Sequence, residues 1–121
     1  MNDWTISLPF PPSVNHYWRM VRGKMLISKA GREYRKAVGL LVFPYAAYGV
    51  PLFPESFRLS VALLAHPPDR RRRDLDNMLK AALDALQHAG VYADDSQIDH
   101  LEIDRGEIWD GGGLEVTIGA L

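Results

Sequence analysis

The sequence predicts a small single-domain α+β protein with a mixed or antiparallel sheet and two main helices. Three observations support this fold class. The chain has only 121 residues, its segments alternate between strand-like and helix-like hydrophobic patterns, and Gly or Pro separates one segment from the next. A chain of this length rarely builds a second hydrophobic core, so we expect one domain over residues 1–121. With 47% hydrophobic and 24% charged residues, the composition excludes disorder of the whole chain.

The N-terminal segment predicts a strand and a hairpin. Residues 4–8 alternate apolar and polar side chains and end at a proline cluster, which is typical of a half-buried strand. Residues 15–27 fit a hairpin that turns near Gly23.

The next segment predicts a helix with one basic face. Ser28 can cap its start, and Pro44 follows its end. We expect basic side chains to point outward and apolar ones inward. The outward set is Lys29, Arg32, Arg35 and Lys36, and the inward set is Tyr34, Val38 and Leu41. Residues 45–54 then have the composition of a linker.

A strand followed by an amphipathic helix forms the centre of the chain. Residues 57–65 place apolar side chains on one side, which indicates a strand. Residues 74–89 give the clearest helix, because their apolar side chains fall on one face and their polar ones on the other. Asp74 or Asp76 can cap its start, and Gly90 can supply the left-handed stop at its end.

The last part of the chain predicts an acidic turn and two strands. The turn is Asp94-Asp95-Ser96, and the strands cover about residues 98–105 and 114–118. Between them, residues 111–113 are three consecutive glycines, which we expect to form a hairpin turn.

Charge is distributed unevenly along the chain. Residues 1–80 hold 13 Lys plus Arg against 6 Asp plus Glu, a formal charge of +7. Residues 81–121 hold 1 against 9, a charge of −8. Such asymmetry favours a polyanionic partner for the basic part.

Some residue types and segments are missing, which narrows the function classes. The sequence has no cysteine, which excludes disulfides and thiolate chemistry and favours a reducing compartment. No apolar run approaches the roughly 18 residues that cross a membrane, and the N-terminus lacks the basic start of an export signal. We therefore expect a cytoplasmic protein without a membrane partner.

Carboxylates and a lysine converge at the start of the central helix. Asp74 and Asp76 are two residues apart, and Lys80 follows Asp76 by about one helical turn on the same face. A helix cap with a surface ion pair is the plain alternative. The second acidic pair, Asp94 and Asp95, favours a bound cation, because repelling carboxylates are tolerated best around one. Oxygen ligands favour Mg²⁺ or Mn²⁺ over Zn²⁺.

Four consecutive arginines, Arg70, Arg71, Arg72 and Arg73, precede this helix. Guanidinium groups bind phosphate oxygens bidentately and stay charged at any physiological pH. A charge run alone is more often a solvated loop, but this one lies directly against the acidic helix start. Arginines, metal and carboxylates together predict phosphodiester hydrolysis of nucleic acid, with Lys80 neutralising charge on the phosphorane or positioning water.

Other catalytic patterns are missing from the sequence. The histidines, His16, His66, His88 and His100, lack the spacing of a zinc site. We expect His66 to be a solvent-facing loop residue. No phosphate-binding glycine loop or nucleophile elbow occurs, which disfavours nucleotide hydrolysis.

Four segments carry a resemblance to a known family. They are LPFPPSVNHYWR at residues 8–19, SKAGREYR at residues 28–35, PDRRRRDLDNMLKAALDAL at residues 68–86, and the acidic pair at residues 94–95. Through them the sequence closely resembles the RusA family of Holliday junction resolvases over nearly its full length. The resemblance implies a homodimeric, Mg²⁺-dependent endodeoxyribonuclease that makes symmetric cuts in opposing strands of a four-way DNA junction.

The resemblance also implies roles for individual residues. It places metal-binding carboxylates at Asp74, Asp76 and Asp95 and an essential lysine at Lys80. Asp94 matches an adjacent acidic position. The arginines at residues 70–73 match basic positions near the site, and their charge suggests contact with DNA.

Distance along the chain leaves two arrangements of the site open. A helix over residues 74–89 is about 24 Å long, and the steps from Gly90 to Asp95 reach at most about 17 Å. Either the acidic turn returns past the helix start, or one protomer's acidic turn completes its partner's site. Two opposed cuts match a twofold axis, which favours a dimer. The alternative function is a non-catalytic nucleic-acid-binding protein with a structural acidic cluster.

Overall fold

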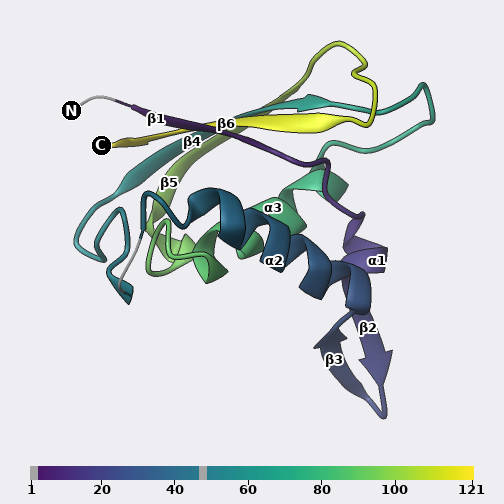
Figure 1. Ribbon diagram of the computed structural model, residues 1–121, viewed down its shortest axis with the longest axis horizontal. Coiled ribbons are helices and arrows are strands. Elements are labelled where there is room, and N and C mark those ends of the chain that lie inside the picture. Colours follow the sequence, from purple (N-terminus) through teal and green to yellow (C-terminus); the bar gives the residue numbers. More distant parts are fainter. Residues whose placement is uncertain (1–2, 47–48) are drawn as a thin grey trace.

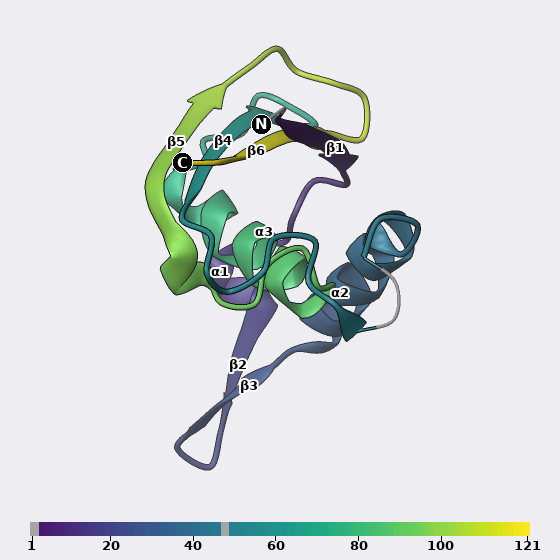
Figure 2. The ribbon, with the colours of Figure 1, turned by 90° about the vertical axis from the view of Figure 1, so that its left-hand side faces the viewer.

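A mixed four-stranded sheet forms one layer of the molecule, and the helices pack against one of its faces (Figures 1 and 2). The computed structural model describes residues 3–46 and 49–121. The strands are β1 (Trp4–Leu8), β4 (Leu59–His66), β5 (Ile98–Arg105) and β6 (Gly113–Ala120), in the order β1-β6-β4-β5. The predicted α+β class is confirmed, and the sheet is mixed because β4 and β5 run parallel.

The parallel pair corrects the prediction of a hairpin at residues 111–113. Parallel strands need a crossover connection, and α3 (Asp76–His88) supplies it between β4 and β5. Strand β6 then pairs antiparallel with the other edge of β4. Gly111 and Gly112 do adopt positive φ, at 79° and 70°. Their turn crosses the end of β4 instead of joining two neighbouring strands.

The N-terminal half contains a short helix, a projecting hairpin and the first long helix. Helix α1 (Val14–Tyr17) leads into β2 (Trp18–Val21) and β3 (Lys24–Ile27), which confirms the hairpin around Gly23. Helix α2 (Lys29–Val42) begins as expected, because the Ser28 hydroxyl accepts a hydrogen bond of 3.0 Å from the Gly31 N–H.

Two predictions about the faces of α2 are wrong. Leu41 is 43% exposed, and Val42 is buried in its place. The core stripe runs through Tyr34, Val38 and Val42, at helical spacing of four residues. This rotation turns Arg35 toward α3, where it is half-buried and ion-paired with Asp84.

Helix α3 begins at Asp76 and not at residue 74. Leu75 precedes its first turn with helical φ and ψ, and no side chain caps the helix, so neither Asp74 nor Asp76 is the cap that we expected. At the other end, Gly90 has a φ of 90°, which confirms the left-handed stop.

The predicted linker at residues 45–54 is partly structured. Residues 47–48 of it lie outside the described residues. Phe53 is buried and forms a β-bridge with Tyr92, so this segment is attached to the chain that follows α3. In the part of the chain that the structure describes, no helix is long and apolar enough to cross a membrane.

Candidate active site

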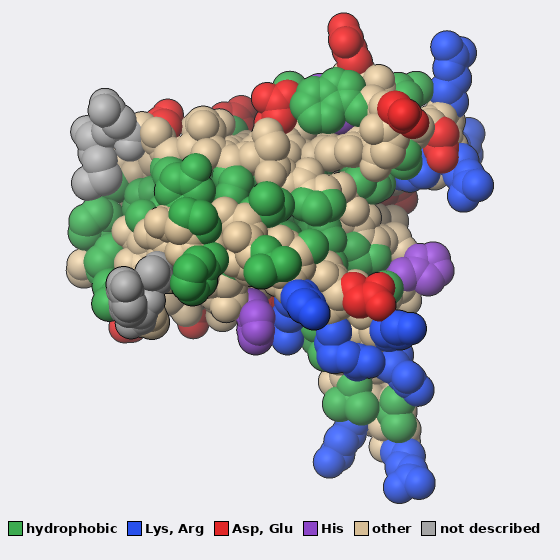
Figure 3. Space-filling model, in the orientation of Figure 1, with side chains coloured by type: hydrophobic (Ala, Val, Ile, Leu, Met, Phe, Trp, Pro, Cys, Tyr) green, Lys and Arg blue, Asp and Glu red, His purple; other side chains and the backbone are tan. Residues whose placement is uncertain are grey.

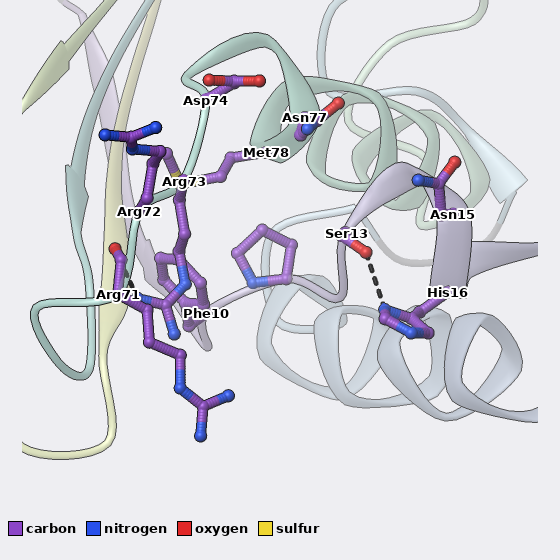
Figure 4. A pocket seen from close by; sticks show the side chains of 11 residues that line it. Phe10, Ser13, Asn15, His16, Arg71, Arg72, Arg73, Asp74, Asn77 and Met78 are labelled. Atoms are coloured by element: carbon purple, nitrogen blue, oxygen red, sulfur yellow. Dashed lines mark hydrogen bonds between the residues drawn. The ribbon is translucent and has the colours of Figure 1, made fainter.

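Two pockets draw on residues 71–84, and no residue lines both of them. The arginine pocket is lined by Arg71, Arg72, Arg73 and Asp74, by Asn77 and Met78, and by residues of the N-terminal segment, including Phe10, Ser13 and His16 (Figure 4). The acidic pocket is lined by Trp18, Asp76, Leu79, Lys80, Leu83, Asp84 and Asp95.

The acidic pocket contains most of the predicted catalytic residues in a single chain. Asp76, Lys80 and Asp84 follow one another by four residues and form a stripe along α3. Asp95 joins them from the short 3₁₀ helix η2 (Asp95–Gln97). In the structure the acidic turn folds back beside its own helix, with the Asp95 backbone bonded to Gln87 in the last turn of α3.

Hydrogen bonds to α3 hold the acidic turn in this position. The Asp95 N–H donates to the Gln87 side chain at 2.9 Å, and the Tyr92 hydroxyl donates to the Leu83 carbonyl at 2.6 Å. The Asp94 carboxylate caps η2 by accepting from the Ser96 N–H at 2.9 Å, and that backbone bond lowers the pKa of Asp94. Asp94 thus caps η2 through one carboxylate oxygen, and Asp95 lines the pocket.

Gln97 joins the same turn to the loop that precedes β4. It is buried, and its side-chain oxygen accepts from the backbone N–H groups of Ala93 and Asp94, at 2.9 and 3.0 Å. Its side-chain NH₂ donates to the carbonyls of Pro54 and Phe57, at 2.9 and 3.0 Å. Because buried amides are costly to leave unpaired, this network fixes the turn against the loop that contains Pro54 and Phe57.

One carboxylate of the acidic pocket is already neutralised within the protein. Asp84 accepts hydrogen bonds from the Tyr17 hydroxyl and from Arg35, whose Nε and Nη2 lie 2.8 and 2.7 Å away. Burial opposes the charge of Arg35, but its bonds to Asp84 and Tyr17 outweigh that cost and raise its pKa. Burial and the bond to Asp84 also raise the pKa of Tyr17 far above its ordinary value.

The other charged groups of the pocket remain available. Asp76, Lys80 and Asp95 are exposed, and none of them forms an ion pair with any residue that the structure describes. Within residues 3–46 and 49–121, no three Asp, Glu or His side chains lie close enough to hold a metal ion together. Two carboxylates and an amine therefore face solvent without a counter-ion among the residues that the structure describes.

The arginine loop is held by its own aspartate. Asp69 accepts from the Arg71 N–H at 2.9 Å and from Arg73 Nη1 at 2.7 Å, and the hydrogen bond from Arg73 lowers the pKa of Asp69 to about 2. The Arg73 guanidinium also lies 5.5 Å from the centre of the Phe10 ring. Arg70 and Arg72 are exposed and have no ion pair within the described residues.

Two predicted placements differ from the structure. Asp74 lines the arginine pocket, so the structure does not bring it together with Asp76 and Asp95. His66 is not a solvent-facing residue: it is 5% exposed, its ring stacks on Trp109 with centroids 3.5 Å apart, and Nε2 lies 2.9 Å from a Glu115 oxygen. The loop between β5 and β6 covers it, which local sequence does not indicate.

Sequence reasoning missed Tyr17, Trp18 and Arg35 as neighbours of the site. All of them fall in segments that carried the family resemblance, at residues 8–19 and 28–35, which was the available signal. Gly31, in the second segment, shows why that motif is constrained. A Cβ at this position would lie 2.5 Å from the Tyr17 carbonyl oxygen, so only glycine allows α2 to approach α1.

Comparisons with known proteins identify the family of the chain. The family model "Endodeoxyribonuclease RusA" matches residues 9–119. The chain is 42% identical over 118 residues to the crossover junction endodeoxyribonuclease of Enterobacteria phage HK97, covering 98% of this chain and 95% of that protein. It is 41% identical, with the same coverage, to the crossover junction endodeoxyribonuclease of Escherichia coli strain K12. The chain therefore belongs to the RusA family of endodeoxyribonucleases.

Proposed function

We propose that the protein resolves four-way DNA junctions by paired, metal-dependent phosphodiester hydrolysis during recombination and repair. The observation that carries this function is the acidic pocket, where Asp76, Asp95 and Lys80 form no ion pair with any described residue, together with a second pocket lined by arginines. Relatives named as crossover junction endodeoxyribonucleases support the choice of substrate.

The residues of the acidic pocket fit the metal cofactor that the family implies. Asp76 and Asp95 offer carboxylate oxygens without a competing cation, and such hard oxygen ligands suit Mg²⁺, with Mn²⁺ as a substitute. Mg²⁺ commonly takes only one or two carboxylates and completes its shell with water and substrate phosphates, so three clustered carboxylates are not required. A bound metal ion supplies an activated water and stabilises the leaving oxygen.

The protein's own groups then bind and orient the substrate. Lys80 Nζ, on the same stripe as Asp76, donates hydrogen bonds to the scissile phosphate and offsets charge that grows on its oxygens. The exposed Arg70, Arg71 and Arg72 hold neighbouring phosphates. Asp74 remains in the proposed metal set because the family resemblance places it there, although it lies in the arginine pocket.

Paired cuts require two active sites, and we propose a homodimer that presents one acidic pocket to each opposing strand. A twofold axis relates the two cut positions of a junction, which matches the symmetry of such a dimer. Light scattering combined with size-exclusion chromatography tests this. A monomer that cuts junctions in both strands at the same concentration would contradict it. We place this activity in the cytoplasm, where the chromosome of a bacterial host lies.

The deciding experiment uses a labelled synthetic four-way junction and a linear duplex of the same sequence. The purified protein is incubated with each DNA in Mg²⁺, in Mn²⁺ and in a chelator. We expect symmetric paired nicks in the junction only, and only with metal. Asp76→Asn should bind the junction but not cut it, while Glu55→Gln, which removes an exposed carboxylate outside both pockets, should cut normally.

Binding without cutting in either metal would contradict the proposed function. That result would mean that the acidic pocket has only a structural role and that the protein binds nucleic acid without cutting it. Cutting of the duplex at the same rate as the junction would retain the nuclease but refute its selectivity for structure.

A further inference from the structure

The β2–β3 hairpin stands clear of the body of the protein, as both ribbon views show (Figures 1 and 2). Opposed residues of an antiparallel ribbon share a face, and so do residues two apart on one strand. Trp18 pairs with Ile27, and Met20 pairs with Met25, so one face of the ribbon is entirely apolar. Trp18 and Ile27 pack against the core, but Met20 is 64% and Met25 59% exposed.

The same hairpin carries only positive charge. Arg19, Arg22 and Lys24 are exposed, residues 18–27 contain no acidic side chain, and none of the three cations has an ion pair in the described part of the chain. In the space-filling view, Lys and Arg side chains mark the tip of the projection and hydrophobic ones lie above them (Figure 3). Such a surface suits a polyanion with apolar groups between its charges.

The turn at the tip gives an independent reason to assign a role to its charge. Arg22 has a φ of 51° and Gly23 a φ of 78°, which is the conformation of a two-residue hairpin turn with both central residues in the left-handed region. Asn or Gly is the favoured residue at the first of these positions, and a bulky side chain there is strained. Arginine therefore occupies this position despite a backbone cost, which a need for its cation at the tip explains.

Position relative to the acidic pocket identifies the occupant. Trp18 both begins β2 and lines the acidic pocket, so the hairpin grows directly from the proposed site of cutting. A strand advances about 3.4 Å per residue, which places Met20 about 7 Å beyond Trp18. Stacked bases are also about 3.4 Å apart, so the methionines reach roughly two base steps from a strand held in the pocket.

We propose that the β2–β3 hairpin is the arm with which the protein opens the base stack at the branch point of a DNA junction. Its cations hold phosphates beside the branch point, and Met20 and Met25 insert between neighbouring bases. Methionine is one of the apolar side chains that proteins use as such wedges, and its flexible chain adapts to irregular gaps. The assignment rests on the proposed function, because it takes junction DNA as the substrate.

The test measures base unstacking directly. Four-way junctions carry the fluorescent base 2-aminopurine at single positions from one to five base pairs from the cut, and protein is added in chelator so that no cutting occurs. The fluorescence of 2-aminopurine rises when it leaves the stack, and we expect a several-fold rise within about three base pairs of the cut. The double variant Met20→Thr/Met25→Thr keeps β-forming side chains, and we expect it to abolish the rise while weakening binding less than about five-fold.

A separate variant tests the role of the positive charge at the tip of the hairpin. Arg22→Asn suits the left-handed turn better than arginine, so we expect equal or higher thermal stability together with junction binding that is about three- to ten-fold weaker. The slope of binding against salt should fall by about one. Leu40→Gln removes an exposed apolar side chain from α2, and Lys36→Gln removes an exposed charge from the same helix; both should behave like the wild type.

Three results would contradict the proposal that the hairpin opens the base stack. The first is a wild-type complex without a fluorescence rise, and the second is a rise that persists in the double methionine variant. The third is a double variant that no longer self-associates in light scattering, which would mean that the apolar face binds a second copy of the chain. Cutting of the same junctions by the wild type in Mg²⁺ is measured in parallel. Cutting without unstacking would contradict the arm alone, whereas no cutting would contradict the proposed function.

Discussion

The acidic pocket and the arginine pocket are built from overlapping stretches of chain but leave opposite charges unpaired. In the arginine pocket, Asp69 is the internal counter-ion and its pairing with Arg73 leaves other guanidinium groups free. In the acidic pocket, Arg35 is the internal counter-ion and its pairing with Asp84 leaves other carboxylates free. Each pocket thus uses one internal counter-ion for structure and exposes its excess charge.

The difference indicates which charges are available for function. A paired group has its charge already offset by a neighbour, which also favours its charged form. Asp84 and Asp95 line the same pocket, but Asp84 is already ion-paired with Arg35, whereas Asp95 forms no ion pair with any residue that the structure describes. A charged residue near a site is therefore not evidence of catalysis until its partners within the protein are known.

The largest expected effect comes from removing the free carboxylates. Asp95→Asn should lower the rate of junction cutting at least about 10³-fold in Mg²⁺, with junction binding retained or tightened because a negative charge is lost. Asp84→Asn is the matched variant in the same pocket. We expect it to retain measurable cutting, since Asp84 is committed to Arg35. Equal losses in both variants, measured by single-turnover cleavage, would refute the distinction between paired and free carboxylates.

A variant of Asp74 tests whether the reaction uses groups from both pockets. We expect Asp74→Asn to lose cutting to a similar degree as Asp95→Asn, as the family resemblance implies. Because Asp74 lies in the arginine pocket, such a loss would mean that the reaction uses groups from both pockets. If Asp74→Asn instead cuts normally but binds the junction differently, Asp74 belongs to DNA binding alone.

A smaller effect is expected from the ion pair that links α2 to α3. Arg35→Met should reduce the free energy of unfolding by about 2 kcal/mol, because it leaves a half-buried Asp84 with one fewer charged donor. The double variant Arg35→Met/Asp84→Leu should recover part of that loss, since no charge is then left unpaired. Urea denaturation of the two single variants, Arg35→Met and Asp84→Leu, and of the double variant measures the coupling. If the losses of unfolding free energy in the single variants simply add in the double variant, the interaction between Arg35 and Asp84 does not contribute to stability.

The exposed arginines should give the next smaller effect, on binding only. Arg71→Gln and Arg72→Gln should each weaken junction binding by about three- to ten-fold and lower the salt slope by about one. Arg73→Gln differs, because Arg73 also holds Asp69 and lies over Phe10. It should weaken binding and lower the melting temperature. Calorimetry alongside binding titrations separates the two classes, and unchanged stability in Arg73→Gln would remove its structural role.

How far the sequence predicted the fold depended on whether the determining contact was local. The bounds of β1 and β5, the Ser28 cap and the Gly90 stop follow from neighbouring residues, and all of them are confirmed. The parallel pairing of β4 with β5 is not local, so the turn at residues 111–113 was wrongly predicted as a hairpin.

The site follows the same rule. Lys80 was placed beside Asp76 correctly because a helical turn joins them. Asp74 was expected in one cleft with Asp76, but it lies in the loop before α3 and lines the arginine pocket, whereas Asp76 lines the acidic pocket. The pairing of Arg35 with Asp84 joins two helices that are far apart in the sequence, and no local pattern indicates it.

The smallest expected effect tests the counter-ion of the arginine pocket through pH. Its hydrogen bond from Arg73 lowers the pKa of Asp69 from 3.8 to about 2. A carboxylate with a lowered pKa in the folded state adds stability that is fully present above about pH 4 and is lost as the pH falls toward 2. Asp69→Asn should therefore flatten the decline in melting temperature over that window, while Glu55→Gln should not. Identical declines in wild type and Asp69→Asn would show that Asp69 is not the group that holds the arginine loop.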